Sequence, residues 1–312
     1  MLDLLIFFVC IFILIILVIS ILMFYYICYK TKQYVVDILS DISKILPHNV
    51  DYEYKVDAPD KADFLDNLTE FLIKMNMLTY NICGGYNYIL PYYIKNIKEL
   101  SKGGYIFKVS GENTYILTFR GTRTGEELIN DLDSVQTNFL DKKDILVHRG
   151  FYRLWRDMKD DLDDFIIDIK SAEIEPKLIF TGHSLGAATS IFSALYIKKK
   201  LDKLKIKNEV SVEVFASPRI GNDKFVYYTQ DKLDSIKVHI NVTDIVVNLP
   251  PITFATLGNT WIYKDFDQTI KHDIQMGSVI LNHRLDIYLY SISSKFRKML
   301  DIKPIWFNTF YS

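Results

Sequence analysis

The stretch KLIFTGHSLGAATSI, residues 177–191, predicts a buried strand that turns sharply into a helix. Its first five residues are mostly apolar, and the run after the second glycine has helical length and patterning. Between the two lies Gly-His-Ser-Leu-Gly, residues 182–186. Gly182 and Gly186 suit a turn in which two backbone segments approach too closely for a Cβ, and Ser184 would project at the start of the helix. Because this geometry is typical of a nucleophilic serine, Ser184 is the leading candidate for catalysis.

Strands and helices alternate along the chain around this turn. We expect strands at 105–110, 114–119, 145–148, 178–181, 210–215 and 237–242, and helices at 62–80, 152–169, 185–203 and 224–233. Such alternation predicts a mostly parallel sheet with helices on both faces, which is an α/β fold. No repeat and no Gly/Ser-rich linker divides residues 50–312, so we expect one soluble domain.

A serine hydroxyl needs a base, and a carboxylate that orients the base, before it can attack a carbonyl carbon. In a fold of this kind the acid and then the histidine follow the serine along the chain. Asp244 comes just after the apolar strand at 237–242, which would place it at the same edge of the sheet as the serine. Only His272 and His283 come later in the chain than this acid. On order alone, both histidines remain candidates for the base.

Six motifs, in the same order along the chain, resemble those of the class 3 lipases, the family of fungal triacylglycerol lipases and plant phospholipase A1-like enzymes. The motifs are Phe-Arg-Gly-Thr at 119–122, Val-His-Arg-Gly-Phe at 147–151, the glycine-flanked serine at 182–186, Pro-Arg-Ile-Gly-Asn at 218–222, Asn-Val-Thr-Asp at 241–244 with Leu-Pro-Pro at 249–251, and His-Arg-Leu-Asp-Ile-Tyr at 283–288. The resemblance extends from about residue 60 to about residue 290. It implies the α/β-hydrolase fold.

The resemblance also implies a Ser184-His283-Asp244 triad. It selects His283 over His272, because His283 begins the motif that holds the family's catalytic histidine. Ser184 would attack an ester carbonyl, His283 would take and return the proton, and Asp244 would orient the imidazole and stabilise its cation. The other motif histidines, His148 and His183, are expected to serve structural roles.

An oxyanion hole and a lid are further implications of the resemblance. The backbone N–H of Leu185 and the N–H and hydroxyl of Thr122 match the family's two donors to the oxyanion. The segment after Thr122 corresponds to the family's lid. Its candidate residues are Glu126, Glu127, Leu128, Ile129 and Leu132. An ordinary surface helix is the alternative interpretation of this segment.

The uncharged apolar run at 4–29 predicts a transmembrane helix, since it exceeds the roughly 20 residues that cross a bilayer. A cleaved signal peptide fits less well, because no basic region precedes the run and no small-residue cleavage site follows it. Two lysines just beyond the run favour a cytosolic catalytic domain under the positive-inside rule. The expected organisation is a transmembrane anchor at 1–30, a membrane-proximal linker helix at 31–58 and a class 3 lipase-like catalytic domain at 59–312.

The composition narrows the classes of partner. With 37 Lys and Arg against 38 Asp and Glu, the chain has no basic excess that would attract nucleic acid. Of the three cysteines, Cys10 and Cys28 fall in the apolar run, so Cys83 alone remains for the soluble part and no disulfide can form there. No Cys and His spacing suggests a metal site, and we expect no cofactor. The expected partners are a lipid ester substrate and a membrane, and no protein partner is indicated.

The expected function is hydrolysis of lipid carboxylic esters by a membrane-anchored serine hydrolase, either triacylglycerol lipase-like or phospholipase A1-like, through an acyl-enzyme intermediate. Two alternatives stay open. One is a catalytically silent lipase-like membrane protein, which the complete set of motif residues disfavours. The other is an acyltransferase or thioesterase on the same fold, because the acyl-enzyme step is common to these reactions.

Overall fold

The computed structural model describes residues 54, 64, 67–86, 88–122, 134–256, 259–299 and 303–308. The predicted transmembrane helix at 4–29 lies outside the described residues, as does the linker helix at 31–58 apart from Tyr54. The lid candidates Glu126, Glu127, Leu128, Ile129 and Leu132 lie outside them as well. Within the described ranges, no helix combines the length and the apolar character needed to cross a membrane.

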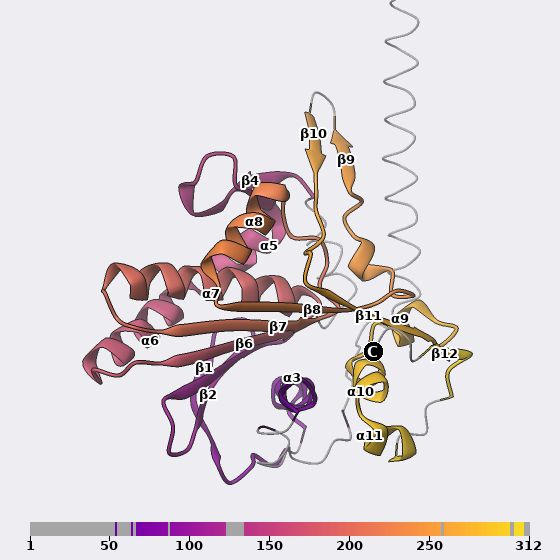
Figure 1. The fold of residues 1–312 in the computed structure, drawn as a ribbon, viewed down its shortest axis with the longest axis horizontal. Helices are drawn as coiled ribbons and strands as arrows, with labels where there is room; N and C mark the ends of the chain where they lie inside the picture. The colour runs from indigo at the N-terminus through magenta and orange to yellow at the C-terminus, as the bar shows by residue number, and fades with distance from the viewer. Residues whose placement is uncertain are drawn as a thin grey trace, which may run out of the picture.

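An eight-stranded sheet forms the centre of the molecule, in the order β1-β2-β3-β6-β7-β8-β11-β12 (Figure 1). The strands are β1 (Ile94–Leu100), β2 (Gly104–Val109), β3 (Thr114–Phe119), β6 (Lys177–His183), β7 (Glu209–Phe215), β8 (Ser235–Asn241), β11 (Thr269–Gln275) and β12 (Trp306–Asn308). Neighbours from β3 to β11 pair in parallel, whereas β1 with β2, β2 with β3, and β11 with β12 pair antiparallel. The prediction of a mostly parallel sheet is confirmed.

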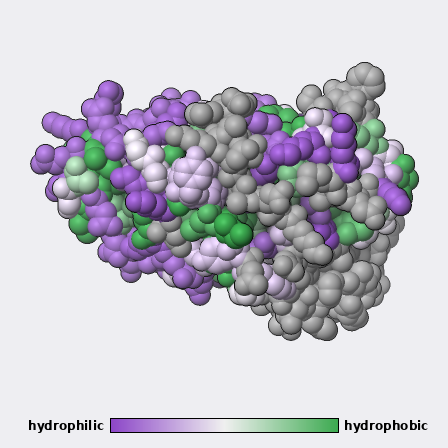
Figure 2. Space-filling model, turned by 90° about the horizontal axis from the view of Figure 1, so that it is seen from below, coloured by the Kyte–Doolittle hydropathy of each residue, from purple (hydrophilic) through white to green (hydrophobic). Residues whose placement is uncertain are grey.

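Helices cover both faces of this sheet (Figure 1). One face carries α5 (Arg149–Arg156), α6 (Lys159–Ser171), α7 (Leu185–Lys203) and α8 (Asp223–Lys232). The other carries α3 (Leu68–Gly84), α10 (Leu285–Ile292) and α11 (Ser294–Met299), with the short α9 (Val279–Asn282) preceding α10. The face below the sheet in Figure 1 presents small hydrophobic patches among hydrophilic residues (Figure 2). The resulting three layers are typical of an α/β fold.

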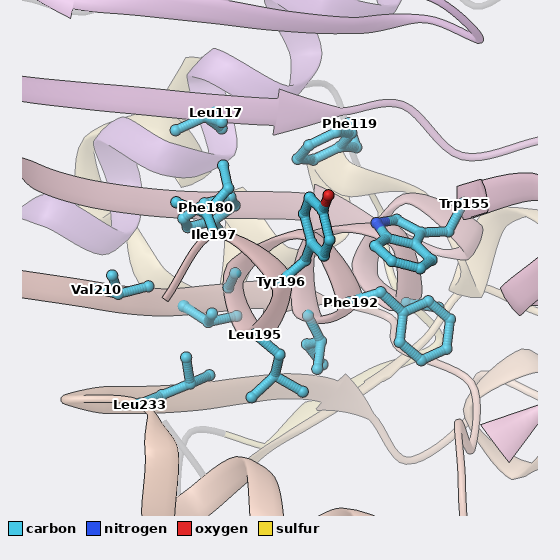
Figure 3. Packing of buried hydrophobic residues seen from close by; sticks show 14 of the residues in the cluster. Leu117, Phe119, Trp155, Phe180, Phe192, Leu195, Tyr196, Ile197, Val210 and Leu233 are labelled. Atoms are coloured by element: carbon cyan, nitrogen blue, oxygen red, sulfur yellow. The ribbon is translucent and has the colours of Figure 1, made fainter. Parts of the chain in front are cut away.

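The core between the sheet and α7 holds the segment that carries Ser184. Residues from β3, β6 and β7 meet aromatic and aliphatic side chains of α5 and α7 there (Figure 3). Trp155 of α5 packs against Phe192 and Tyr196 of α7, and its Nε1–H donates to the Ser193 hydroxyl at 3.2 Å. Because both faces of β3 and β6 are covered, these strands are buried over nearly their whole length.

Most predicted elements occur close to their predicted bounds, but three features differ. The predicted helix at 152–169 is two helices, since α5 ends at Arg156 and α6 begins at Lys159. The predicted strand at 145–148 is β5 (Leu146–His148), which pairs with β4 (Gln136–Asn138) outside the main sheet. The unpredicted elements are strands β1, β4, β11 and β12, the hairpin of β9 (Thr253–Thr256) and β10 (Asn259–Ile262), and helices α9, α10 and α11. Two short 3₁₀ helices, η1 (Phe139–Asp141) and η2 (Val246–Asn248), complete the elements.

Candidate active site

Ser184 lies at the junction of β6 and α7 with an unusual backbone conformation. Its φ of 59° and ψ of −126° are rare for any residue other than glycine, and such strain persists only where the surroundings enforce it. A Cβ at Gly186 would collide with the carbonyl oxygen of Phe119, and a Cβ at Gly182 would collide with the carbonyl group of Gly186. The Ser184 N–H donates to the Phe215 carbonyl at 3.0 Å, which fastens the turn to β7. This is the sharp strand-to-helix turn that the sequence predicted.

His283 and Asp244 form a short hydrogen bond beside this turn. His283 Nδ1 lies 2.6 Å from Asp244 Oδ2, and Asp244 is fully buried. The other carboxylate oxygen, Oδ1, accepts from the Val246 N–H at 2.9 Å. Since a carboxylate only accepts, the proton of a neutral His283 lies on Nδ1 and leaves Nε2 as the basic nitrogen. The His283 ring centroid is 4.6 Å from that of His183, the residue before Ser184, so His283 lies next to the serine turn.

The order of residues along the chain left both His272 and His283 as possible partners of Asp244, and the structure distinguishes between them. His272 lies within β11, almost completely buried, and contacts His239 Nδ1 through Nε2 at 3.0 Å and the Ser291 hydroxyl through Nδ1 at 2.8 Å. Burial, together with the charge of His239, lowers the pKa of His272 to about 3. His272 is therefore a neutral buried residue whose two nitrogens are occupied, and Asp244 pairs with His283 instead.

The predicted oxyanion donors lie on either side of the serine turn. Leu185 is the first residue of α7, and the first N–H groups of a helix have no partner within it. Thr122 follows β3, and its hydroxyl is buried without a hydrogen-bond partner in the described structure. A Cβ at Gly121, one residue earlier, would lie 2.9 Å from the Cβ of Ser184. The loop that carries Thr122 therefore packs directly on the serine turn.

Two asparagines that sequence reasoning did not assign to the site hold the His283 loop to the Asp244 loop. Asn282, the residue before His283, donates to the Thr243 carbonyl at 3.1 Å and accepts from the Met276 N–H at 2.7 Å. Asn241, the last residue of β8, donates to the Asn282 carbonyl at 3.0 Å, and its own N–H donates to the Tyr288 hydroxyl at 2.9 Å. Both asparagines are buried. In the sequence, the signal for these two asparagines was their position close to Asp244 and His283.

Comparison with known proteins shows which family part of the chain resembles. Residues 116–254 match the model of the family described as lipase (class 3). Over this segment, which is less than half of the chain, the sequence is similar to the class 3 lipases. It is similar to a lipase of Rhizopus niveus, with 29% identity over 162 residues that cover 51% of this chain and 41% of that protein. A second relative is the secreted mono- and diacylglycerol lipase 1 of Fusarium solani, with 30% identity over 109 residues that cover 35% of this chain and 31% of the relative.

The solved structures show the same fold. Lipase II from Rhizopus niveus superimposes with a TM-score of 0.53 at 20% sequence identity, and the match covers 72% of this chain and 94% of that chain. This likeness, with the central sheet and its covering helices, shows the α/β-hydrolase fold that the motifs implied. In the sequence comparison, the chain spans about two fifths (41%) of the length of the Rhizopus niveus relative.

The predicted localisation, a single-pass membrane protein with a cytosolic catalytic domain, is contradicted by two findings. The longest helix in the described ranges, α7, has 19 residues, and no helix there meets the requirements for crossing a membrane. In α7 the last six residues include four lysines and one aspartate, and charged side chains are costly in hydrocarbon. The relative from Fusarium solani is named as a secreted enzyme.

Proposed function

We propose that this chain is a serine hydrolase that cleaves carboxylic esters of lipids. The observation that carries the proposal is the 2.6 Å hydrogen bond between His283 and the buried Asp244, formed beside a serine with strained backbone geometry. The buried hydroxyl of Thr122, unpartnered in the described structure, supports the same conclusion, since a polar atom of this kind gains a partner when an oxyanion forms next to it.

The proposed reaction proceeds through an acyl-enzyme. The Ser184 oxygen attacks the ester carbonyl carbon while His283 Nε2 takes the hydroxyl proton, and Asp244 stabilises the imidazolium. The tetrahedral oxyanion receives hydrogen bonds from the Leu185 N–H and from Thr122. When the intermediate collapses, the alcohol leaves with the proton from His283. A water molecule, deprotonated by the same nitrogen, then attacks the acyl-serine. His283 returns this proton to the Ser184 oxygen as the bond to the acyl group breaks and the carboxylic acid is released.

The surroundings of the acid favour an apolar substrate. Val242 and Ile245, which flank the buried Asp244, are 42% and 40% exposed, and Ile252 nearby in the chain is 53% exposed. Exposed apolar side chains next to a reaction site suit contact with acyl chains better than with a polar metabolite. The Rhizopus niveus relative is named a lipase and the Fusarium solani relative acts, by its name, on mono- and diacylglycerols. We therefore assign the substrate to the glycerolipids.

A fluorophosphonate probe tests the nucleophile, because it reacts with activated serines. We expect labelling of the purified full chain, loss of labelling in Ser184→Ala and His283→Ala, and unchanged labelling in a control, Ser101→Ala, at an exposed loop serine. Labelling that persists in Ser184→Ala would contradict the assignment of the nucleophile.

A substrate panel tests the class of ester. It contains mono-, di- and triacylglycerols, a diacyl phospholipid, a thioester and a short water-soluble ester. We expect release of fatty acid from at least one glycerolipid, at a higher rate than from the soluble ester. Preferential turnover of the thioester, or transfer of the acyl group to an added alcohol in place of water, would replace the hydrolase proposal with the thioesterase or acyltransferase alternative.

A further inference from the structure

Three hydrogen bonds in series join the loop before Thr122 to the backbone of His283. The Gly121 N–H donates to the Tyr80 hydroxyl at 2.8 Å. The Tyr80 hydroxyl lies 2.9 Å from His183 Nδ1, and His183 Nε2 lies 2.7 Å from the His283 carbonyl oxygen. The link therefore begins in the segment that carries one proposed oxyanion donor and ends on the proposed base.

The direction of each bond follows from the chemistry of its ends. A carbonyl oxygen only accepts, so His183 must carry its proton on Nε2 to bond to His283. Burial, and then the nearby His283, hold the pKa of His183 well below its usual range, so the ring is neutral and Nδ1 is an acceptor. The Tyr80 O–H must therefore donate to Nδ1, while its oxygen accepts from Gly121. Only one arrangement of protons satisfies all three bonds.

Close packing gives the link little freedom to move. A Cβ at Gly121 would lie 2.7 Å from the His183 carbonyl oxygen. The Tyr80 and His183 rings meet edge to face with centroids 5.8 Å apart, and the His183 and His283 rings have centroids 4.6 Å apart. Tyr80 belongs to α3, which packs on the opposite face of the sheet from α7. The side chain that joins the two loops is thus held by a third element.

From this geometry we infer that Tyr80 and His183 are positioning residues that set the placement of the Thr122 loop relative to His283. The inference rests on the proposed ester hydrolysis. The base and the oxyanion donor act on the same tetrahedral intermediate, so an error in their relative placement raises the barrier to reaction. Neither residue touches the reacting atoms in this assignment. Their loss should therefore lower kcat more than it changes KM.

Three substitutions dissect the link. Tyr80→Phe keeps the ring and removes the hydroxyl that both accepts from Gly121 and donates to His183. His183→Gln retains a donor near the position of Nε2 and removes the acceptor at Nδ1. His183→Asn retains an acceptor near Nδ1 and removes the donor to the His283 carbonyl. The matched control is Tyr196→Phe, which removes a tyrosine hydroxyl that bonds to Asp163 on the other face of the sheet.

With a glycerolipid substrate, we expect kcat to fall about tenfold in Tyr80→Phe, equivalent to about 1.4 kcal/mol, with KM changed less than about twofold. Both His183 variants should show a similar fall. The double variant Tyr80→Phe/His183→Gln should lose less than the product of the two single losses, because both changes break the same link. Tyr196→Phe should keep the wild-type kcat even where its melting temperature falls as far as that of Tyr80→Phe.

Nitrogen-15 NMR of the histidine side chains tests the link without relying on activity. The spectrum of the wild-type chain should show His183 as the neutral Nε2–H tautomer at pH 6. A protonated ring, or the Nδ1–H tautomer, would overturn the inferred bond directions and with them the proposal.

The outcomes separate the two proposals. A wild-type chain that neither hydrolyses an ester nor reacts with the fluorophosphonate contradicts the proposed function, and the positioning role falls with it. An active wild-type chain in which Tyr80→Phe has the same kcat as Tyr196→Phe overturns the positioning role alone.

Discussion

Replacing Thr122 with valine should make the protein more stable and less active. Valine has nearly the same shape as threonine but carries a methyl group in place of the hydroxyl. In the described structure the Thr122 hydroxyl is buried without a hydrogen-bond partner. A buried hydroxyl of this kind costs about 1–3 kcal/mol, because it has left water and gained nothing in return. The same hydroxyl is one of the donors that we propose for the oxyanion, so the cost is recovered only during the reaction.

The expected magnitudes follow from these two roles. Thr122→Val should raise the free energy of unfolding by about 1 kcal/mol or more, since the unpaired hydroxyl is gone. For a domain of this size each kcal/mol corresponds to a rise of about 2–4 °C in melting temperature. Loss of an oxyanion donor should lower kcat about 100-fold, at the lower end of the usual range because the Thr122 N–H is retained. KM should change little, because the bond forms in the transition state.

The assay combines calorimetric melting with steady-state hydrolysis of a glycerolipid. Thr118→Val is the matched control, because the buried Thr118 hydroxyl accepts a hydrogen bond from Thr79 at 2.7 Å. The same substitution there should lower the melting temperature and leave kcat within about twofold of the wild type. Suppose that Thr122→Val melts at a lower temperature than the wild type and keeps its kcat. Burial of the Thr122 hydroxyl then does not destabilise the protein, the hydroxyl does not serve in catalysis, and the reasoning fails.

Three further predictions concern the acid, the turn and the second histidine. Asp244→Asn should lower kcat about 10⁴-fold with little change in the far-UV circular dichroism spectrum, because an amide favours the wrong His283 tautomer; a kcat within tenfold of the wild type would contradict the role of Asp244. Gly186→Ala should cost about 3 kcal/mol or more, since its Cβ meets the Phe119 carbonyl, and an unchanged melting temperature would show that the turn can relax. His272 has a pKa lowered to about 3 by burial and by the charge of His239. Its unfolded form takes up a proton near pH 6.5 and its native form does not, so the free energy of unfolding should fall as the pH drops from about 6.5 towards 3. Urea denaturation at pH 7 and pH 5 should show a smaller fall in His272→Gln than in the wild type, and equal falls would contradict the assignment.

Much of the fold could be predicted because the central strands and α7 carry strong local signals. The strand at 114–119 and the helix at 185–203 have the bounds expected from their patterns, since both are apolar over most of their length and are covered on more than one side. The outer strands carry weaker signals. Strand β1 reads Ile-Lys-Asn-Ile-Lys-Glu-Leu and, among the described strands, pairs with β2 alone, so its polar residues obscure the pattern.

The residues that we propose to carry the chemistry have signals in the sequence, whereas the residues that hold them in place do not. Ser184 and Asp244 follow directly from the glycine-flanked turn and from the end of an apolar strand. Tyr80 gave no such signal, because it stands within an ordinary amphipathic helix and reaches the site only when α3 packs beneath β6. Asn282 offered only its place next to His283, and its hydrogen bond to the Thr243 carbonyl joins loops that are distant in the chain. Residues of this kind become visible only once the tertiary contacts are known.

The sequence contained a local signal that separates His272 from His283, namely the alternation of residues along β11. That signal could not be used before β11 was recognised as a strand. In a strand, residues two apart share a face, so His272 lies on the same face as Ile270 and Ile274. His272 and Ile274 are both buried, so this face packs against a helix and cannot present a base to a substrate. His283 stands in the loop before α10 with 20% of its side chain exposed, so its ring can bond to the buried Asp244 and still exchange a proton. A catalytic base needs both a bond to its acid and access for proton exchange. Within this sheet only a residue beyond the strand ends can meet these two conditions.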